Sequence, residues 1–596
     1  MDDELLDRVR GEVGREAWEH SGLRWEAGPD SPTVRVFADA LLEAGDPRGK
    51  AIVLRRRVRE TGHGRDIERL RRHKASLPDP WRPPLPHLEH RPLGEMYGFT
   101  VHLGAHLEDL APLASVLDEP EAGLFASVEL LAPVQESSVV VDRLCDAPIP
   151  GLRHLNLSRI PLDGRGVRQL MRAPHLQGIV AVTVNVDWSG FAALAQGTWR
   201  LLALRLVTPT RHRRLITPSA PAPLDDAPGL QDLEVLETQG RVTELPGLAD
   251  RFGLPRLHRL RLGALRSEDA QPLATSTKLP RLAKLHMDSY EGTEYGLARL
   301  IASPGLPMLE TLRIDRIAVS IGEGLFEMAP LPDAHPVRLR SLARERNGSF
   351  LARESLERIA RSGALGRVAE LELGNCELGP GFLDALLAAP DLSRLTSLAF
   401  FGVGLRAHDL AQLDGQRLTS LDTLRLQSNP LGNDGMRVLA DLPILAQLRV
   451  LKLLPNVAGL PGIEALSASP LLQRLEHLQI ALPHSSGLSC LAASPRLRPR
   501  VLTIEPMDYD LADVEALAAS PVLSNVEELS LSRMPVEGLP YLVESPFTKR
   551  IEVLGVGLWN AEAMRKARPW LRRARDIWPA LRQVHGVPGG FWLEDR

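Results

Sequence analysis

The side chains with the clearest chemical potential in this sequence are a small set of histidines. His102, His106 and Asp109 have the spacing that would bring metal ligands together on successive turns of a helix. His102, however, falls in a predicted strand, where side chains four residues apart lie about 13 Å from each other. His87 and His90 stand in a proline-rich stretch and are an equally weak pair. We therefore expect no metal site.

Two other segments superficially suggest catalysis. Gly45–Lys50 is one residue short of the Gly-x-x-x-x-Gly-Lys-Ser/Thr phosphate loop, and Ala51 stands where the magnesium-binding hydroxyl should be. We interpret it as a turn between two helices, with glycines supplying positive φ. Cys490 falls in a helical segment, Gly487–Ala493, which favours burial over use as a nucleophile. No serine-hydrolase elbow, zinc-protease motif or dinucleotide fingerprint occurs, so the sequence predicts neither an enzyme nor a cofactor.

The overall composition is that of a folded protein with an aliphatic core. The 596 residues include 44% apolar and 24% charged side chains but only 4% aromatic ones. The three cysteines are too few and too far apart for a disulfide framework. Met1–Leu6 is acidic where a signal peptide would be basic, and no apolar run approaches the ~20 residues that span a bilayer. We expect a cytoplasmic protein without a membrane partner.

One short pattern, apolar-x-x-apolar-x-apolar, recurs along most of the chain. It is clearest in copies that begin at Val368, Leu395, Leu421, Leu448 and Leu475, which are 26 or 27 residues apart. The same frame continues outward to Leu152, Ile179, Leu201, Leu230, Leu257, Leu282, Leu309, Val526 and Ile551, with degenerate copies near Gly98, Phe125, Leu339 and Pro499. The frame predicts roughly eighteen units over residues 98–558.

Two further positions connect this period to a structural unit. An Asn or Cys follows the strand pattern in several copies, at Cys376, Asn429 and Asn456, where it can bond the backbone of the turn that leaves the strand. A proline recurs five residues before the next copy, at Pro120, Pro174, Pro304, Pro390, Pro443, Pro470, Pro521 and Pro546. Helix-forming residues precede these prolines, so each unit is predicted to be strand, turn and helix.

This pattern resembles the leucine-rich-repeat family, and a period near 27 with a full helix in each unit is similar to its ribonuclease-inhibitor-like branch. The resemblance implies an α/β solenoid, a horseshoe with a parallel sheet on the concave face and helices on the convex face. No unit could bury its apolar side alone, so stacking supplies the core. Residues 559–596, which gather tryptophans and arginines, are expected to cap the array.

The N-terminal part lacks the repeat. Residues 1–72 look helical, and the segment Val34–Lys50, with its Gly-Asp-Pro-Arg-Gly core, resembles a short bacterial repeat-companion domain found at the N-terminus of repeat proteins. That resemblance implies a bacterial source and no known chemistry. Residues 73–97 are rich in proline, which favours an extended linker.

Alternation within each strand predicts which side chains form the concave surface. Early units contribute His154, Asn156, Thr183 and Asn185. Later units contribute a basic band made of Arg259, Arg261, Lys284, His286 and Arg313, flanked by the acidic pairs Asp232/Glu234 and Glu370/Glu372. Phe401 and Leu454 are candidate apolar anchors beside it. Either these polar residues keep a wide surface soluble, or the basic band binds an acidic patch on a partner.

Three classes of function fit these features. The first is a scaffold or regulator that binds a protein partner, supported by an extended surface without catalytic motifs. The second is a GTPase-activating protein, because one leucine-rich-repeat family of similar period has that activity; it would require an exposed loop arginine or asparagine aimed at the nucleotide. The third is nucleic-acid binding through the basic band, which a net charge of −4 disfavours.

Overall fold

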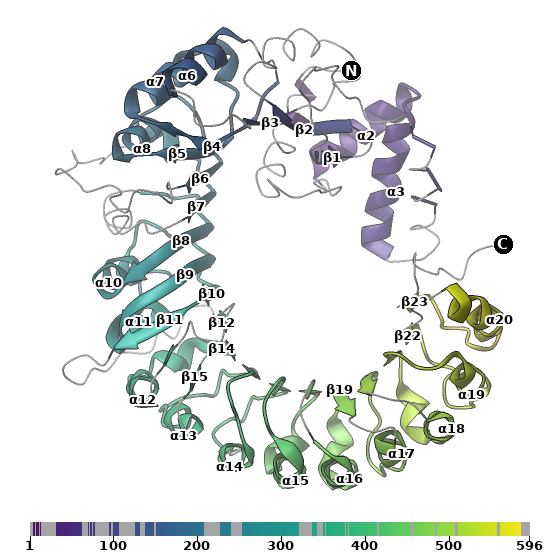
Figure 1. Ribbon diagram of the computed structural model, residues 1–596. Helices are drawn as coiled ribbons and strands as arrows, with labels where there is room; N and C mark the ends of the chain where they lie inside the picture. Colours follow the sequence, from purple (N-terminus) through teal and green to yellow (C-terminus); the bar gives the residue numbers. More distant parts are fainter. Residues whose placement is uncertain are drawn as a thin grey trace. The chain divides into compact units, whose positions relative to one another are not determined.

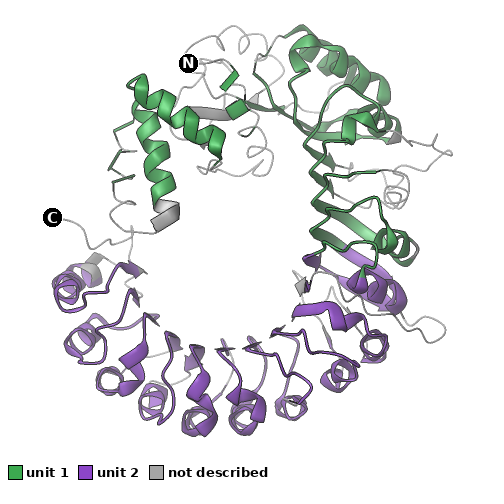
Figure 2. Cartoon of the chain, turned by 180° about the vertical axis from the view of Figure 1, so that it is seen from behind, with its two compact units in different colours: residues 1–288, 303–309 green, residues 289–302, 310–596 purple. Residues whose placement is uncertain are grey.

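The computed structural model describes these residues, by number: 4–5, 8–10, 12, 31–61, 69–70, 72–73, 76–77, 94–96, 99–105, 126–130, 137–147, 149, 151–207, 227–239, 253–320, 336–342, 350–351, 353–375, 377–378, 381–413, 416–454, 458–482, 486–506, 510–556 and 561–585. The chain divides into two compact units, coloured separately in Figure 2. Unit 1 contains Met1–Asp288 and Ser303–Leu309, and unit 2 contains Ser289–Ala302 and Glu310–Arg596.

Unit 1 begins with two packed helices, α2 (Pro32–Glu43) and α3 (Pro47–Thr61). Gly45 lies between them with a φ of +73°, a left-handed conformation that glycine adopts at no steric cost. Gly49 lies inside α3, where an added Cβ would come within 2.7 Å of the Ala38 carbonyl oxygen. The segment is a turn between two helices, as predicted, but its second glycine permits close helix packing rather than a positive φ.

An apolar cluster joins this helical segment to the first strands of unit 1. Its buried members are Leu5, Val9, Val34, Phe37, Ala38, Leu41, Ile52 and Ala126. Because Ala126 directly precedes strand β3 (Ser127–Leu130), the N-terminal helices pack on the sheet itself. The apolar faces of α2 and α3 are thereby removed from water, which is the main source of their stability.

The rest of unit 1 is a sheet that starts with an antiparallel pair and continues in parallel. Strand β1 (Gly94–Met96) lies within the predicted linker and pairs with β2 (Phe99–Ala105). The parallel strands that follow are β3, β4 (His154–Leu162), β5 (Ala181–Val186), β6 (Ala203–Val207), β7 (Val235–Gln239), β8 (Arg259–Arg266) and the start of β9 (Lys284–Thr293). The helices between them are α6 (Ser137–Asp146), α7 (Gly164–Arg172), α8 (Trp188–Ala195) and α10 (Ser267–Thr275).

Unit 2 continues the same alternation. Its main parallel strands are β10 (Thr311–Ile314), β12 (Val337–Leu342), β14 (Val368–Gly374), β16 (Ser397–Phe401), β17 (Thr423–Arg425), β18 (Val450–Lys452), β19 (His477–Leu482), β20 (Val501–Pro506), β21 (Glu528–Leu531), β22 (Val553–Val556) and β23 (Gln583–His585). A second parallel row joins the end of β9 to β11 (Ile317–Ser320), β13 (Phe350–Leu351) and β15 (Glu377–Leu378).

The helices of unit 2 all lie on one side of its sheet. They are α11 (Glu294–Ala302), α12 (Arg353–Arg361), α13 (Phe382–Leu387), α14 (Ala407–Leu410), α15 (Gly432–Asp441), α16 (Leu460–Ala468), α17 (Ser486–Ala492), α18 (Leu511–Ala518), α19 (Leu539–Glu544) and α20 (Ala561–Ile577). Within this unit the strands line the inner side of an arc and the helices its outer side (Figures 1 and 2). We call the side of each sheet that faces away from the helices the sheet face.

The repeat that starts at Leu421 shows why the sequence folds this way. Leu424 of β17, Leu426 just after it and Leu439 of α15 are all fully buried. Pro443 follows α15 by two residues and begins a short 3-10 turn. A proline lies two or three residues beyond the helix in each of these described repeats, as predicted: Pro174, Pro304, Pro390, Pro443, Pro470, Pro521 and Pro546.

Asn429 performs the backbone role that its position predicted. Its side-chain oxygen accepts hydrogen bonds from the Val403 and Leu405 N–H groups at 3.1 and 3.2 Å. Its amide donates to the carbonyl oxygens of Phe400 at 2.8 Å and of Leu426 at 3.0 Å. One buried amide therefore satisfies the turns of two neighbouring repeats. Cys376 and Asn456 lie outside the described residues.

Two recurring features of the repeats were not anticipated. A left-handed residue follows the strand at the same position of four copies: Asn375, Gly402, Ser428 and Arg533. In three repeats, the serine before the proline donates a hydrogen bond to the helix of the preceding repeat. The bonds run from Ser469 to the Ala440 oxygen at 2.6 Å, from Ser520 to the Ala492 oxygen at 2.6 Å, and from Ser545 to the Ala518 oxygen at 2.5 Å. These bonds join each repeat to the one before it.

The chain folds as an α/β leucine-rich-repeat solenoid. The parallel ladder, the helix in each unit and the buried asparagine carry that assignment. Parallel pairing continues to β23, beyond residue 558, where the strand pattern was expected to stop. In the described part of the chain, no helix is both long and apolar enough to cross a membrane.

Candidate partner-binding surface

The strand register of unit 2 arranges its sheet-face side chains in two columns. Strand β19 shows the alternation plainly, because its residues are half-buried and fully buried in turn. The first column contains Glu370, Ser397, Thr423, Val450, His477, Val501, Glu528, Val553 and Gln583. The second contains Glu372, Ala399, Arg425, Lys452, Gln479, Thr503, Ser530, Gly555 and His585.

In unit 1, four members of the predicted basic band lie on the sheet face. Arg259 and His286 are half-buried and Lys284 is exposed. Arg261 forms an ion pair with Asp288 at 2.9 Å, an acidic neighbour that the sequence reading did not include. The positive charge of Arg261 is therefore partly compensated within its own surface.

The acidic pair predicted beside this band was assigned to the wrong residues. Strand β7 begins at Val235, and the ladder pairs Glu237 with Arg205 on one side and Arg261 on the other. Asp232 and Glu234 precede the strand, so they do not occupy the sheet-face columns. Glu237 is the acidic residue on this face, and it forms a mostly buried ion pair with Arg205 at 3.0 Å.

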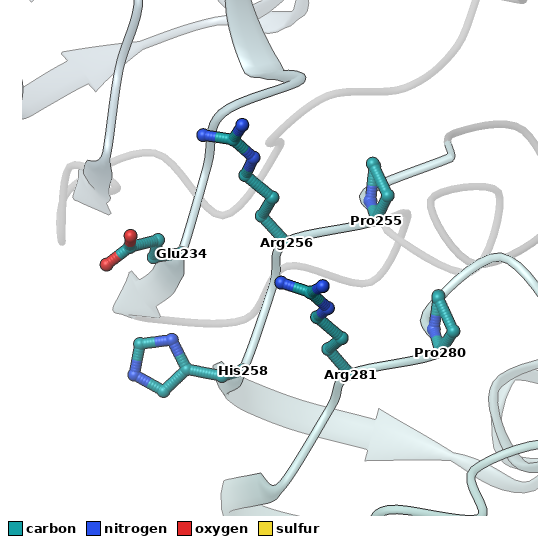
Figure 3. Close-up of a pocket in the computed structure, with 6 residues that line it drawn as sticks. All are labelled: Glu234, Pro255, Arg256, His258, Pro280 and Arg281. Atoms are coloured by element: carbon teal, nitrogen blue, oxygen red, sulfur yellow. The ribbon is translucent and has the colours of Figure 1, made fainter.

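Asp232 and Glu234 instead lie beside a cavity of about 670 Å³ at the edge where the strands begin. Its lining residues are Glu234, Pro255, Arg256, His258, Pro280 and Arg281 (Figure 3). Two successive Pro-Arg pairs, one from each of two neighbouring repeats, contribute both arginine side chains to this lining (Figure 3). Arg256 forms an ion pair with Asp232 at 2.9 Å. The cavity is open, and its cationic side chains are partly neutralised by these two carboxylates.

The predicted residues in unit 2 also carry compensating charges. Arg313 is exposed and pairs with Asp315 at 2.8 Å. Glu370 pairs with Arg338 of β12 at 2.9 Å, and the register sets Arg340 beside Glu372. The spacing predicts a degenerate repeat near Leu339, but it does not identify the two arginines of β12 as partners of the acidic pair Glu370/Glu372.

Several side chains expected on the surface are buried. His154, Asn156, Thr183 and Asn185 are each at most 8% exposed, and the His154 Nδ1 atom lies 2.8 Å from the Ser127 hydroxyl. These four side chains therefore belong to the interior of unit 1 rather than to a binding surface. Leu454 is only 4% exposed, which removes it as an apolar anchor. Phe401 remains half-exposed on the sheet face.

A separate row of charges follows the edge of unit 2 where the strands begin. Three exposed pairs lie there: Arg449 with Glu476 at 2.7 Å, Arg500 with Glu527 at 2.7 Å, and Arg582 with Glu552 at 3.6 Å. The hydrogen bond from Arg500 lowers the pKa of the Glu527 carboxyl. Because it contains three arginines and three glutamates, this row neutralises itself and offers no net charge to a partner.

The thiols of the described part of the chain are poor nucleophiles. Burial, followed by the charges of Glu464 and Asp513, raises the pKa of Cys490 in α17. Burial and nearby aspartates likewise raise the pKa of Cys145 in α6. Both side chains are therefore neutral thiols near pH 7. His102 lies in β2, as predicted, while His87, His90, His106 and Asp109 lie outside the described residues.

No protein-family model and no curated protein matches this sequence. Among solved structures, the chain is similar to an internalin, inlF, from Listeria monocytogenes str. 4b F2365, with 15% identity and a TM-score of 0.28 over 60% of this chain and 81% of that one. It is also similar to a chain from the yeast complex of Rad7 and Elc1, with 13% identity and a TM-score of 0.30 over 70% and 87%. The repeat geometry, not these likenesses, carries the fold assignment.

Proposed function

We propose that this chain is a scaffold or regulator that binds a protein partner on the sheet face of its solenoid. The observation that carries the proposal is the pair of side-chain columns in unit 2, because it is a rigid, partly exposed array fixed by backbone pairing. Such an array can be complementary to a partner without any rearrangement of the backbone. An acidic patch on the partner would meet Arg259, Arg261, Lys284 and His286 of unit 1. We propose Arg313 of unit 2 as a separate partner contact.

We also infer the finer assignments that the sequence suggested. The helix present in most described repeats supports membership of the ribonuclease-inhibitor-like branch. The packed pair α2 and α3 supports a separate helical companion domain in residues 1–72. A bacterial origin and a cytoplasmic location follow from the same resemblance and from the composition of the chain. Phe401 is proposed as an apolar anchor beside the charged positions.

Charge reversal tests this proposal. A variant with Arg259→Glu, Arg261→Glu and Arg313→Glu should lose capture of the native partner while its thermal unfolding remains cooperative. The matched control reverses three exposed helical arginines, Arg437→Glu, Arg565→Glu and Arg572→Glu, for the same change in net charge. Undiminished capture by the sheet-face variant, or equal loss in the control, would show that the partner does not bind these residues.

A further inference from the structure

Three basic side chains gather on the sheet face of unit 2. Arg425 of β17 pairs in register with Lys452 of β18, and Val450 of β18 pairs with His477 of β19. His477 is therefore a diagonal neighbour of Lys452 on the same face. With strands about 4.8 Å apart, the group spans roughly 10 Å across three strands. We refer to Arg425, Lys452 and His477 as the basic triad.

No carboxylate is bonded to this triad within the described residues, which sets it apart from other arginines on the sheet faces. Arg205, Arg261, Arg313 and Arg338 each have an ion pair with a carboxylate. In contrast, the Nε atom of Arg425 is buried without a hydrogen-bond partner. A buried donor without an acceptor costs free energy, so this nitrogen is a local cost to folding.

The members of the triad also repel one another. Burial and then the charge of Arg425 lower the pKa of Lys452, and Glu528 offsets this only in part. Burial, followed by the charges of Lys452 and Arg425, lowers the pKa of His477 to about 4. At neutral pH the site therefore holds a neutral imidazole and two cations, of which Lys452 is partly compensated by Glu528. Anionic groups placed here would gain attraction from both cations.

We propose that the basic triad is the docking site for an acidic segment of a protein partner, with two carboxylates that meet Arg425 and Lys452. This inference rests on the proposed function, because it assumes that the sheet face binds protein. Arg425 supplies a partly exposed guanidinium group without a bonded carboxylate, and Lys452 supplies a second, partly exposed cation on the adjacent strand. His477 borders the site on the β19 side.

The charges around the triad favour a short acidic segment over a nucleic acid. Glu372 lies two strands before Arg425, and Glu528 lies two strands after His477. A phosphate backbone that ran along this face would meet these carboxylates within about 10 Å of the triad. A nucleic-acid interface also requires many cations in a row. Two carboxylates separated by one residue would fit between Glu372 and Glu528.

Fluorescence anisotropy with the full chain tests the site. The probes are a labelled peptide with two aspartates one residue apart, the same peptide with asparagines, and a labelled single-stranded oligonucleotide. The variants are Arg425→Gln and Lys452→Gln. The control is Arg449→Gln, which removes one positive charge from an exposed arginine at the strand-entry edge. Thermal unfolding monitored by circular dichroism establishes that each variant is folded.

The aspartate peptide should bind the wild-type chain about a hundredfold more tightly than the asparagine peptide, because two charged hydrogen bonds are lost and each contributes about tenfold. Each triad variant should lose about tenfold in affinity for the aspartate peptide, while the control keeps its affinity. Equal binding of the two peptides, or unchanged affinity in folded triad variants, would overturn the site. Tighter binding of the oligonucleotide through the same residues would overturn the assignment to protein.

These experiments distinguish a failure of the basic triad as a docking site from a failure of the proposed function. If the aspartate peptide does not bind but the Arg259, Arg261 and Arg313 variant still loses its partner, only the triad is refuted. If that variant keeps its partner while the peptide binds at the triad, the sheet face binds protein through the basic triad and not through the basic band.

Discussion

Arg425 and Lys452 are paired positions on adjacent parallel strands, and each faces the other's positive charge without a bonded carboxylate. Most cross-strand pairs stabilise a sheet, whereas like charges directly opposite destabilise it. On the preceding strands the arginine instead has a carboxylate on the adjacent strand, since Arg338 pairs with Glu370 at 2.9 Å. The arrangement of Arg425 and Lys452 is therefore a local cost to folding that a bound anionic partner would remove.

Removing one of these charges should not weaken the fold. We expect Arg425→Gln to raise the free energy of unfolding by about 0.5–2 kcal/mol, since it ends the repulsion and eliminates a partly buried cation. Urea unfolding at pH 7 measures this. Arg449→Gln serves as the control, because it loses only an exposed ion pair and should change stability by less than about 0.5 kcal/mol. A marked loss of stability in Arg425→Gln would indicate a structural role instead.

Acid should destabilise the chain in part through His477. Its pKa falls from the ordinary 6.5 to about 4 in the folded state, chiefly because of burial and then because of Lys452 and Arg425. Between these values the unfolded chain binds the additional proton, so the free energy of unfolding decreases as pH falls from 6.5 toward 4. We expect a contribution of about 1 kcal/mol, because the imidazole is only partly screened from solvent.

The variant His477→Gln isolates this contribution. Urea unfolding of the wild type and the variant at several pH values between 4 and 7 should show a shallower pH dependence in the variant. Parallel curves for the two proteins would mean that His477 titrates normally in the folded chain. Other histidines are unchanged in the comparison and cancel from the difference.

Asn429 should be among the most costly polar side chains to remove. The change Asn429→Ala leaves the Val403 and Leu405 N–H groups buried without acceptors, so we expect a loss of about 2–4 kcal/mol. Asn525→Ala is the matched control, because Asn525 only accepts an exposed hydrogen bond from Arg550. Equilibrium denaturation compares them. Equal effects would show that the buried amide does not hold the repeats together.

The sequence was sufficient for the repeat and for most of the strand positions. The regular leucines from 368 to 480 allowed one frame only, and β14, β16, β17, β18 and β19 fall within it. Near Leu230 the leucines fit two frames, one ending at Val235 and the other at Thr238. The structure uses the second, because Thr238 is fully buried and accepts a hydrogen bond from the Gly263 N–H at 3.2 Å. Because a polar residue occupies this core position, the hydrophobic pattern alone does not identify the correct repeat frame.

The surface was harder to predict, because alternation does not tell whether the outer side of a sheet is covered. The side chains at His154 and Asn156 alternate as expected, yet they are buried. Arg425 and Lys452 could be assigned to the sheet face from their spacing alone. The absence of a bonded carboxylate beside them could not be predicted, because the neighbours of each strand depend on the register and on the side-chain contacts. Asn375 and Ser428 occupy the same position of their repeats, so the spacing could have indicated that this position has a special backbone conformation.

The claim that a partner binds the sheet face is tested most directly by site-specific photo-crosslinking. A photoreactive amino acid would replace Phe401 on β16 in one variant and Arg437 on the exposed side of α15 in another. Irradiation of each variant with the native partner should give a covalent adduct from position 401 and none from position 437. An adduct from position 437 alone would place the partner on the helices and contradict the account.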